Sequence, residues 1–148
     1  MPRTPFALTF LLCLASQGRA QSIDSLIRTK RCYQLGYLTP QDSATSRFFP
    51  DTITLAPGRD SGQVIPDRTY VDSVFGDSAL DPFFPVLGYW TAERDSVQLV
   101  VTNGMARAII LFPSTLGNSL VGRAFFHSDA INPRPPRMSI RGTRFSCH

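Results

Sequence analysis

The sequence predicts an all-β domain: a small antiparallel up-and-down barrel of about eight strands, with a β-sandwich as the alternative. Short runs in which apolar and polar residues alternate recur along the chain, and turn-forming residues separate them about every eight to twelve positions. Residues that favour exposed helices are scarce, since Glu93 is the only Glu and Lys30 the only Lys. The 148 residues fit one domain, because domains usually run to roughly 100–150 residues.

The clearest element is a hairpin over residues 95–112. Asn103-Gly104 lies between two β-rich runs, a pattern typical of a two-residue type I′ turn, in which both central residues have positive φ. This turn would pair Thr102 with Met105, and the pairing continues along both strands. One face of the hairpin is then apolar and the other mixed. The apolar face comprises Val97, Leu99, Val101, Ala106, Ala108 and Ile110, and the mixed face Ser96, Gln98, Val100, Arg107 and Ile109.

Further strands follow from the same alternation. We expect them over residues 32–38, 52–55, 69–75, 86–90, 119–127 and 138–147. Residues rich in Gly, Pro, Asp and Ser predict loops over 58–62, 76–82 and 113–118 and a linker over 131–136.

The first twenty residues have the composition of a secretory signal peptide. Arg3 precedes an apolar run over residues 6–15, and the small residues Gly18 and Ala20 follow. A buried N-terminal helix is the alternative. Cleavage after Ala20 would export the protein to the periplasm or the medium. Residues 21–31 would then be a lead-in, with a short helix over 23–31, to a single barrel domain over 32–148.

Two cysteines remain after such a cleavage. Cys32 and Cys147 flank nearly the whole domain, and exported compartments are oxidising, which predicts a disulfide between them. In a closed barrel the first and last strands are neighbours, and paired strands bring Cα atoms to about 4.5–5.5 Å. Unpaired thiols and a metal site are the alternatives. A zinc site would need about four ligands, and only His127 and His148 are available beside the cysteines.

The tripeptide Gly88-Tyr89-Trp90 has the G-x-W form of the lipocalin-like (calycin) barrels, and the run of hairpins over 95–147 resembles their barrel wall. The sequence departs from that pattern in one respect. The family has its G-x-W on the first strand, whereas here the motif lies past the middle of the chain. The resemblance implies a small closed barrel in which Arg141 or Arg144 stacks on Trp90, and it brings no particular ligand.

Sequence motifs for catalysis are absent. The run His127-Ser128-Asp129 holds the residue types of a hydrolase triad, but adjacent residues cannot adopt triad geometry. Glu93 and Asp95 could form a carboxylate pair, although solvated acids are ordinary before a strand. The sequence has no nucleophile elbow, phosphate-binding loop or calcium loop. We therefore expect no enzymatic activity, no cofactor and no metal.

Charge and hydropathy also exclude some partners. The net charge is +4, but the arginines are scattered along the chain, so we expect no nucleic-acid partner. No apolar run reaches the roughly 18 residues that a transmembrane helix needs.

The remaining candidates for function are aromatic. Phe48-Phe49-Pro50 and Phe83-Phe84-Pro85 could cover the core as a lid or form an apolar binding mouth. Large residues expected to point inward, such as Phe112, favour a filled interior. We expect non-enzymatic binding of a small apolar ligand or of an envelope protein partner; a structural cell-envelope domain is the alternative, and a hydrolase with an unrecognised site a third. The candidate ligand-binding residues are Phe83, Phe84, Trp90 and Phe126.

Overall fold

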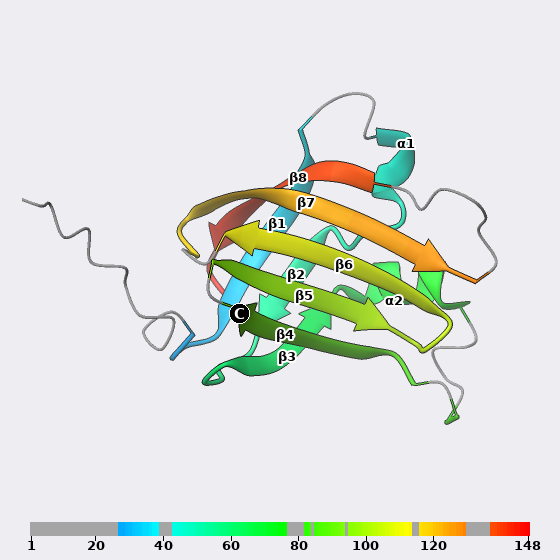
Figure 1. The fold of residues 1–148 in the computed structure, drawn as a ribbon, viewed down its shortest axis with the longest axis horizontal. Coiled ribbons are helices and arrows are strands. Elements are labelled where there is room, and N and C mark those ends of the chain that lie inside the picture. Colours follow the sequence, from blue (N-terminus) through cyan, green and yellow to red (C-terminus); the bar gives the residue numbers. More distant parts are fainter. Residues whose placement is uncertain are drawn as a thin grey trace, which may run out of the picture.

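The computed structural model describes residues 27–38, 43–76, 82–83, 85–93, 95–113, 116–129 and 137–148. It is a closed barrel in which eight antiparallel strands follow one another in sequence order (Figure 1). The strands are β1 (Arg31–Tyr37), β2 (Thr52–Leu55), β3 (Ser61–Pro66), β4 (Leu87–Glu93), β5 (Ser96–Thr102), β6 (Ala106–Pro113), β7 (Ser119–Ser128) and β8 (Arg137–Phe145). Two short helices, α1 (Ser43–Ser46) and α2 (Arg68–Val74), interrupt the series.

Pairing between the first and last strands closes the sheet. Tyr33 on β1 has Ile53 of β2 as its partner on one side and Arg144 of β8 on the other. Because β1 is hydrogen-bonded on both sides, it is not an edge strand. The up-and-down barrel is confirmed in place of the sandwich. The expected signal peptide and the linker over 131–136 lie outside the described residues.

The strand expected over 69–75 is wrong, because this segment forms α2. Asp67 caps the helix, and its side-chain oxygen accepts a hydrogen bond from the Tyr70 amide at 2.8 Å. Tyr70 and Phe75 are buried, with Val71 and Val74 packed against the same core, which is the spacing of one helical face. The β-branched residues of this segment resemble a strand, but the cap and the helical spacing decide its structure.

Sequence patterning also missed β3. The loop expected over 58–62 ends early, since β3 begins at Ser61. Only Val64 is fully buried in this strand, so its alternation of apolar and polar residues is weak. Gly62 takes a central place in the ladder, opposite Trp90.

The β5–β6 hairpin is present, with a register different from the predicted one. Thr102 pairs with Arg107, not with Met105, and Val101 pairs with Ala108. Gly104, with φ 91°, is the first residue of a two-residue loop. The Asn103 side-chain oxygen accepts hydrogen bonds from the amides of Met105 and Ala106, at 3.1 and 2.9 Å. The partner of each residue moves by two positions, so the same residues still face inward.

The segment before β1 and the segment after β8 both lie beside the start of β1. Residues 27–30 are not helical, and β1 begins at Arg31, so this part of the expected helical lead-in is wrong. Ile27 is buried, and its carbonyl accepts a hydrogen bond from the Gly58 amide at 3.2 Å, so the segment covers that end of the barrel. The disulfide between Cys32 and Cys147 is confirmed, with a Cα–Cα distance of 5.4 Å. Cys147 lies just beyond β8, whose last residue Phe145 is the partner of Cys32.

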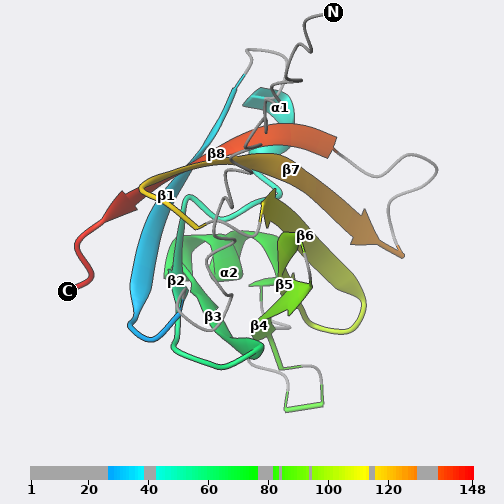
Figure 2. The ribbon, with the colours of Figure 1, turned by 60° about the vertical axis from the view of Figure 1, so that its left-hand side comes forward.

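Side chains fill the interior of the barrel. Trp90, Tyr33 and Phe112 are among the largest fully buried residues, and they lie on β4, β1 and β6. At one end the core includes Ile27 and Leu116. Toward the other end it includes residues of α2, which lies within the ring of strands in Figure 2. The interior is therefore a packed core.

Candidate functional site

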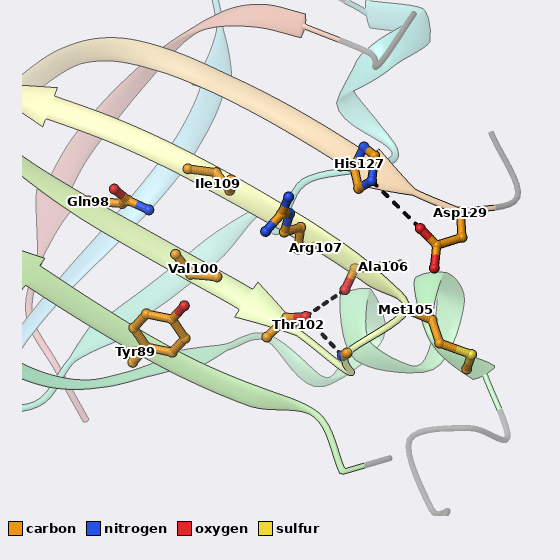
Figure 3. A pocket seen from close by; sticks show the side chains of 11 residues that line it. Tyr89, Gln98, Val100, Thr102, Met105, Ala106, Arg107, Ile109, His127 and Asp129 are labelled. Atoms are coloured by element: carbon orange, nitrogen blue, oxygen red, sulfur yellow. Dashed lines mark hydrogen bonds and ion pairs between the residues drawn. The ribbon is translucent and has the colours of Figure 1, made fainter. Parts of the chain in front are cut away.

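The candidate site is a hollow of about 270 Å³ on the outer surface of β4 to β7, called the outer hollow below (Figure 3). Successive side chains of a strand alternate between the core and the outer face, so this hollow is lined by side chains that point out of the barrel. Its lining comprises Tyr89, Gln98, Val100, Thr102, Gly104, Met105, Ala106, Arg107, Ile109, His127 and Asp129.

A row of apolar side chains forms the floor. Tyr89, Val100 and Ile109 are direct neighbours across β4, β5 and β6 (Figure 3). Val100 is only 3% exposed, although the buried residues on either side of it in sequence point into the barrel. The larger side chains beside it therefore cover the short valine and create a recess.

Polar and charged groups surround this floor. Arg107 and His127 are neighbours across β6 and β7, and both are exposed. His127 Nε2 lies 3.7 Å from Asp129 Oδ1, in an exposed pair. The Thr102 hydroxyl donates to the Ala106 carbonyl at 2.8 Å, so it belongs to the turn. The guanidinium of Arg107 has no ion-pair partner among the described residues and can bind a carboxylate through two parallel hydrogen bonds.

The hollow does not have the geometry of a hydrolase site. Ser128 lies between His127 and Asp129 in sequence, and in a strand its side chain points to the opposite face from His127. The described residues contain no cluster of His, Cys, Asp and Glu that could hold a metal ion. The apolar floor can hold a short apolar group, and Arg107 can bind an acidic group.

The candidate ligand-binding residues do not form one site. Trp90 is fully buried, and its indole N–H donates to the Ala56 carbonyl at 2.9 Å. Phe126 is 3% exposed and stacks on Phe48, with ring centroids 4.9 Å apart. Phe83, by contrast, is 86% exposed. Phe84 lies outside the described residues.

The G-x-W motif has a packing role. A side chain at Gly88 would collide with the Val64 carbonyl oxygen, so only glycine allows β3 and β4 to approach there. The expected stacking of a late arginine on Trp90 is wrong among the described residues. Arg141 is exposed on β8, and the described cation–π contacts are Arg47 over Phe48 and Arg137 over Phe125.

The first Phe-Phe-Pro segment belongs to the lid of the core, one of the two roles expected for it. Phe49 and Pro50 are buried, and Phe48 packs against the core beside Phe126. Arg47 covers the outer side of the Phe48 ring, with 4.9 Å from the guanidinium carbon to the ring centroid.

Sequence reasoning did not find the outer hollow. The one signal was the mixed face of the β5–β6 hairpin, which includes Gln98, Val100, Arg107 and Ile109. Tyr89 and His127 come from strands farther along the chain in either direction, and only the pairing of the strands brings them to the same place.

Comparison of the chain with protein families, curated proteins and solved structures finds no match. In the part of the chain that the structure describes, no helix is long and apolar enough to cross a membrane. The class of protein defined here is therefore structural: a closed eight-stranded antiparallel barrel with one disulfide, compatible with a lipocalin-like fold.

Proposed function

We propose that this barrel is an exported, non-enzymatic binding protein that recognises a protein partner through the outer hollow. The filled interior is the observation that carries the proposal. Trp90 and Tyr33 are 0% exposed, and the lumen they occupy is the place where a lipocalin-like barrel would otherwise hold a small apolar ligand. Recognition then falls to the outside of the barrel.

The surroundings of the hollow support a protein partner. Leu87 and Met105 are exposed apolar side chains at or beside its rim, and Tyr89 of the floor is exposed as well. Protein interfaces are enriched in Tyr, Met and Arg, and their most important contacts are side chains anchored in desolvated pockets. A partner side chain on the floor, with a carboxylate bound by Arg107, would match both the shape and the charge of the site.

The disulfide supports export, because such bonds persist in oxidising compartments. The N-terminal residues have the pattern of a signal peptide. Delivery to the periplasm or to the medium agrees equally well with these features. The barrel and the Gly88-Tyr89-Trp90 motif support kinship with the lipocalin-like proteins. In this protein the proposed binding site is on the outer surface of the barrel instead of in its interior.

Site-specific photo-crosslinking in the native host tests the proposal. A photoreactive amino acid replaces Gln98 in the hollow, and the matched control replaces Gln63, an exposed residue of β3. We expect a discrete protein adduct from position 98 that disappears when Arg107→Glu is added, and no such adduct from position 63. Equal adducts from both positions, or an adduct that survives Arg107→Glu, would contradict the proposal.

Native mass spectrometry of the protein purified from its own host tests the alternative ligand site. A mass equal to that of the polypeptide supports binding at the surface. An additional mass that is released on unfolding would place a small ligand in the lumen and overturn the proposal.

A further inference from the structure

A second surface of the barrel is strongly basic. Arg123 on β7 and Arg137 and Arg141 on β8 are exposed on the outer wall, and we call this surface the arginine face. Arg123 is the partner of Ser139, which lies midway between the two arginines of β8. Diagonal neighbours in a sheet are about 7–8 Å apart, so the three guanidinium groups surround one small region. Arg123 and Arg137 belong to successive strands, and the pairing of β7 with β8 brings them together.

No acid on the surrounding strands neutralises this charge. Strands β1, β6, β7 and β8 contain no Asp or Glu. None of the three arginines forms an ion pair with a described residue. By contrast, Asp60, Glu93 and Asp95 lie at the ends of β3, β4 and β5. Of these, β3 and β4 lie across the barrel from β7 and β8 in Figure 1, whereas β6 alone separates β5 from β7.

Apolar side chains accompany the arginines. Val121, directly opposite Arg141, is 52% exposed. Phe125 is the partner of Arg137, whose guanidinium carbon lies 5.6 Å from the centroid of the phenyl ring. A nucleic-acid surface would need aromatic rings that are free to stack on bases, and here the arginine already covers the ring. An exposed aliphatic residue between cations suits the boundary between lipid headgroups and hydrocarbon instead.

We propose that the arginine face docks the barrel on a membrane surface rich in anionic phospholipids. The guanidinium groups bind lipid phosphates, for which their planar, two-pronged geometry is suited. Val121 enters the headgroup region between them. Asp60 and Glu93, at the ends of β3 and β4, then lie on strands across the barrel from the membrane contact. This surface is separate from the outer hollow, and its role does not depend on the proposed protein partner.

The expected affinity is modest and depends on salt. A basic residue near an anionic membrane contributes on the order of 1 kcal/mol, which corresponds to about a fivefold change in binding. Replacing all three arginines should therefore weaken binding on the order of a hundredfold. High salt should weaken binding by the wild-type protein in the same way.

Co-sedimentation with vesicles tests the inference. The purified, disulfide-bonded protein is mixed with vesicles of phosphatidylcholine, with or without phosphatidylglycerol. We expect binding only when the anionic lipid is present. The triple variant Arg123→Gln, Arg137→Gln and Arg141→Gln should lose it. The matched control, Arg28→Gln, Arg59→Gln and Arg68→Gln, removes the same charge from exposed positions elsewhere and should keep it. Thermal unfolding of both variants verifies that they fold.

Two further measurements distinguish binding to an anionic membrane from binding to other polyanions. Val121→Ser leaves the charge unchanged and should weaken vesicle binding, because it removes an apolar side chain from the contact. A fluorescent single-stranded oligonucleotide should bind more weakly than the anionic vesicles at the same salt concentration. Equal vesicle binding by the two triple variants would overturn the inference. Oligonucleotide binding that is tighter than vesicle binding and unaffected by Val121→Ser would overturn it as well.

Discussion

The disulfide provides the sharpest test of how the barrel is held together. Cys147→Ser removes the bond to Cys32 and changes no residue of the paired strands. Cys32 is buried at the beginning of β1, where β1 pairs with both β2 and β8. The bond joins this seam to residues that lie beyond the end of β8. Loss of the bond therefore raises the conformational entropy of the unfolded chain and weakens the pairing of β1 with β8. It removes no side chain from the core.

The magnitude follows from the length of the closed loop. The two cysteines are 115 residues apart. In the chain-entropy treatment, a loop of that length restricts the unfolded chain enough to stabilise the folded state by about 5 kcal/mol. For a domain of this size the unfolding entropy converts that loss to a decrease of roughly 15–20 °C in melting temperature. Opening of the seam would also expose strand edges, so we expect more aggregation in the variant.

Thermal unfolding with and without reductant measures the effect. The oxidised wild type should melt far above the Cys147→Ser variant, and the fully reduced wild type should melt close to it. Mass measurement after alkylation supplies an independent check, because a formed disulfide protects both sulfur atoms until it is reduced. If both cysteines of the native protein are alkylated without reduction, or if reductant leaves the melting temperature unchanged, the reasoning is refuted.

Three further predictions concern packing, capping and a buried hydroxyl, each measured as the free energy of unfolding in urea. Gly62→Ala should destabilise the barrel by about 1–3 kcal/mol, because its new methyl group would stand 2.5 Å from Trp90 Nε1, whereas Gly36→Ala has open space and should cost little; equal effects would contradict this. Asp67→Ala should cost about 1–2 kcal/mol or more, since one carboxylate oxygen accepts the Tyr70 amide and the other the amides of two further residues; a loss below about 0.5 kcal/mol would argue against the cap. Tyr70→Phe should be neutral or stabilising near pH 7, because the buried hydroxyl has no hydrogen-bond partner among the described residues. Burial, reinforced by Asp67, raises the pKa of Tyr70 above its usual value, so the folded state favours the neutral phenol. That contribution to stability is present below the pKa of an unfolded tyrosine and is lost as the pH rises above it. The wild type should therefore lose stability at alkaline pH more steeply than Tyr70→Phe, and parallel pH profiles would contradict the assignment.

Local patterns predicted most of the strands correctly. In β6 to β8 the alternation of side chains is regular, and the residues expected to face inward, such as Ala108 and Ile110, are buried. The disulfide could also be predicted, because export would leave a single pair of cysteines in an oxidising compartment. Both inferences depend on short-range chemistry or on counting, which a sequence displays directly.

Segments in which two local signals compete were predicted less well. In residues 68–74, β-branched residues favour a strand, while Asp67 and the spacing of Tyr70, Val74 and Phe75 favour a helix. The hairpin at Asn103 and Gly104 had the expected turn residues, but the Asn103 side chain bonds to the turn itself, and the register shifted by two positions. In each case a side-chain hydrogen bond of about 3 Å stabilises the local structure that forms.

The sequence by itself determined the fold class, the strands with regular alternation, the faces they bury and the one disulfide. The tertiary structure alone decided what the outer wall of the barrel presents. The arginine face combines residues of β7 and β8, and the lining of the outer hollow comes from four strands. The physical reason is that the core constrains only every second residue of a strand. The residues between them acquire their neighbours only when the strands pair, and long-range pairing leaves no local pattern in the sequence.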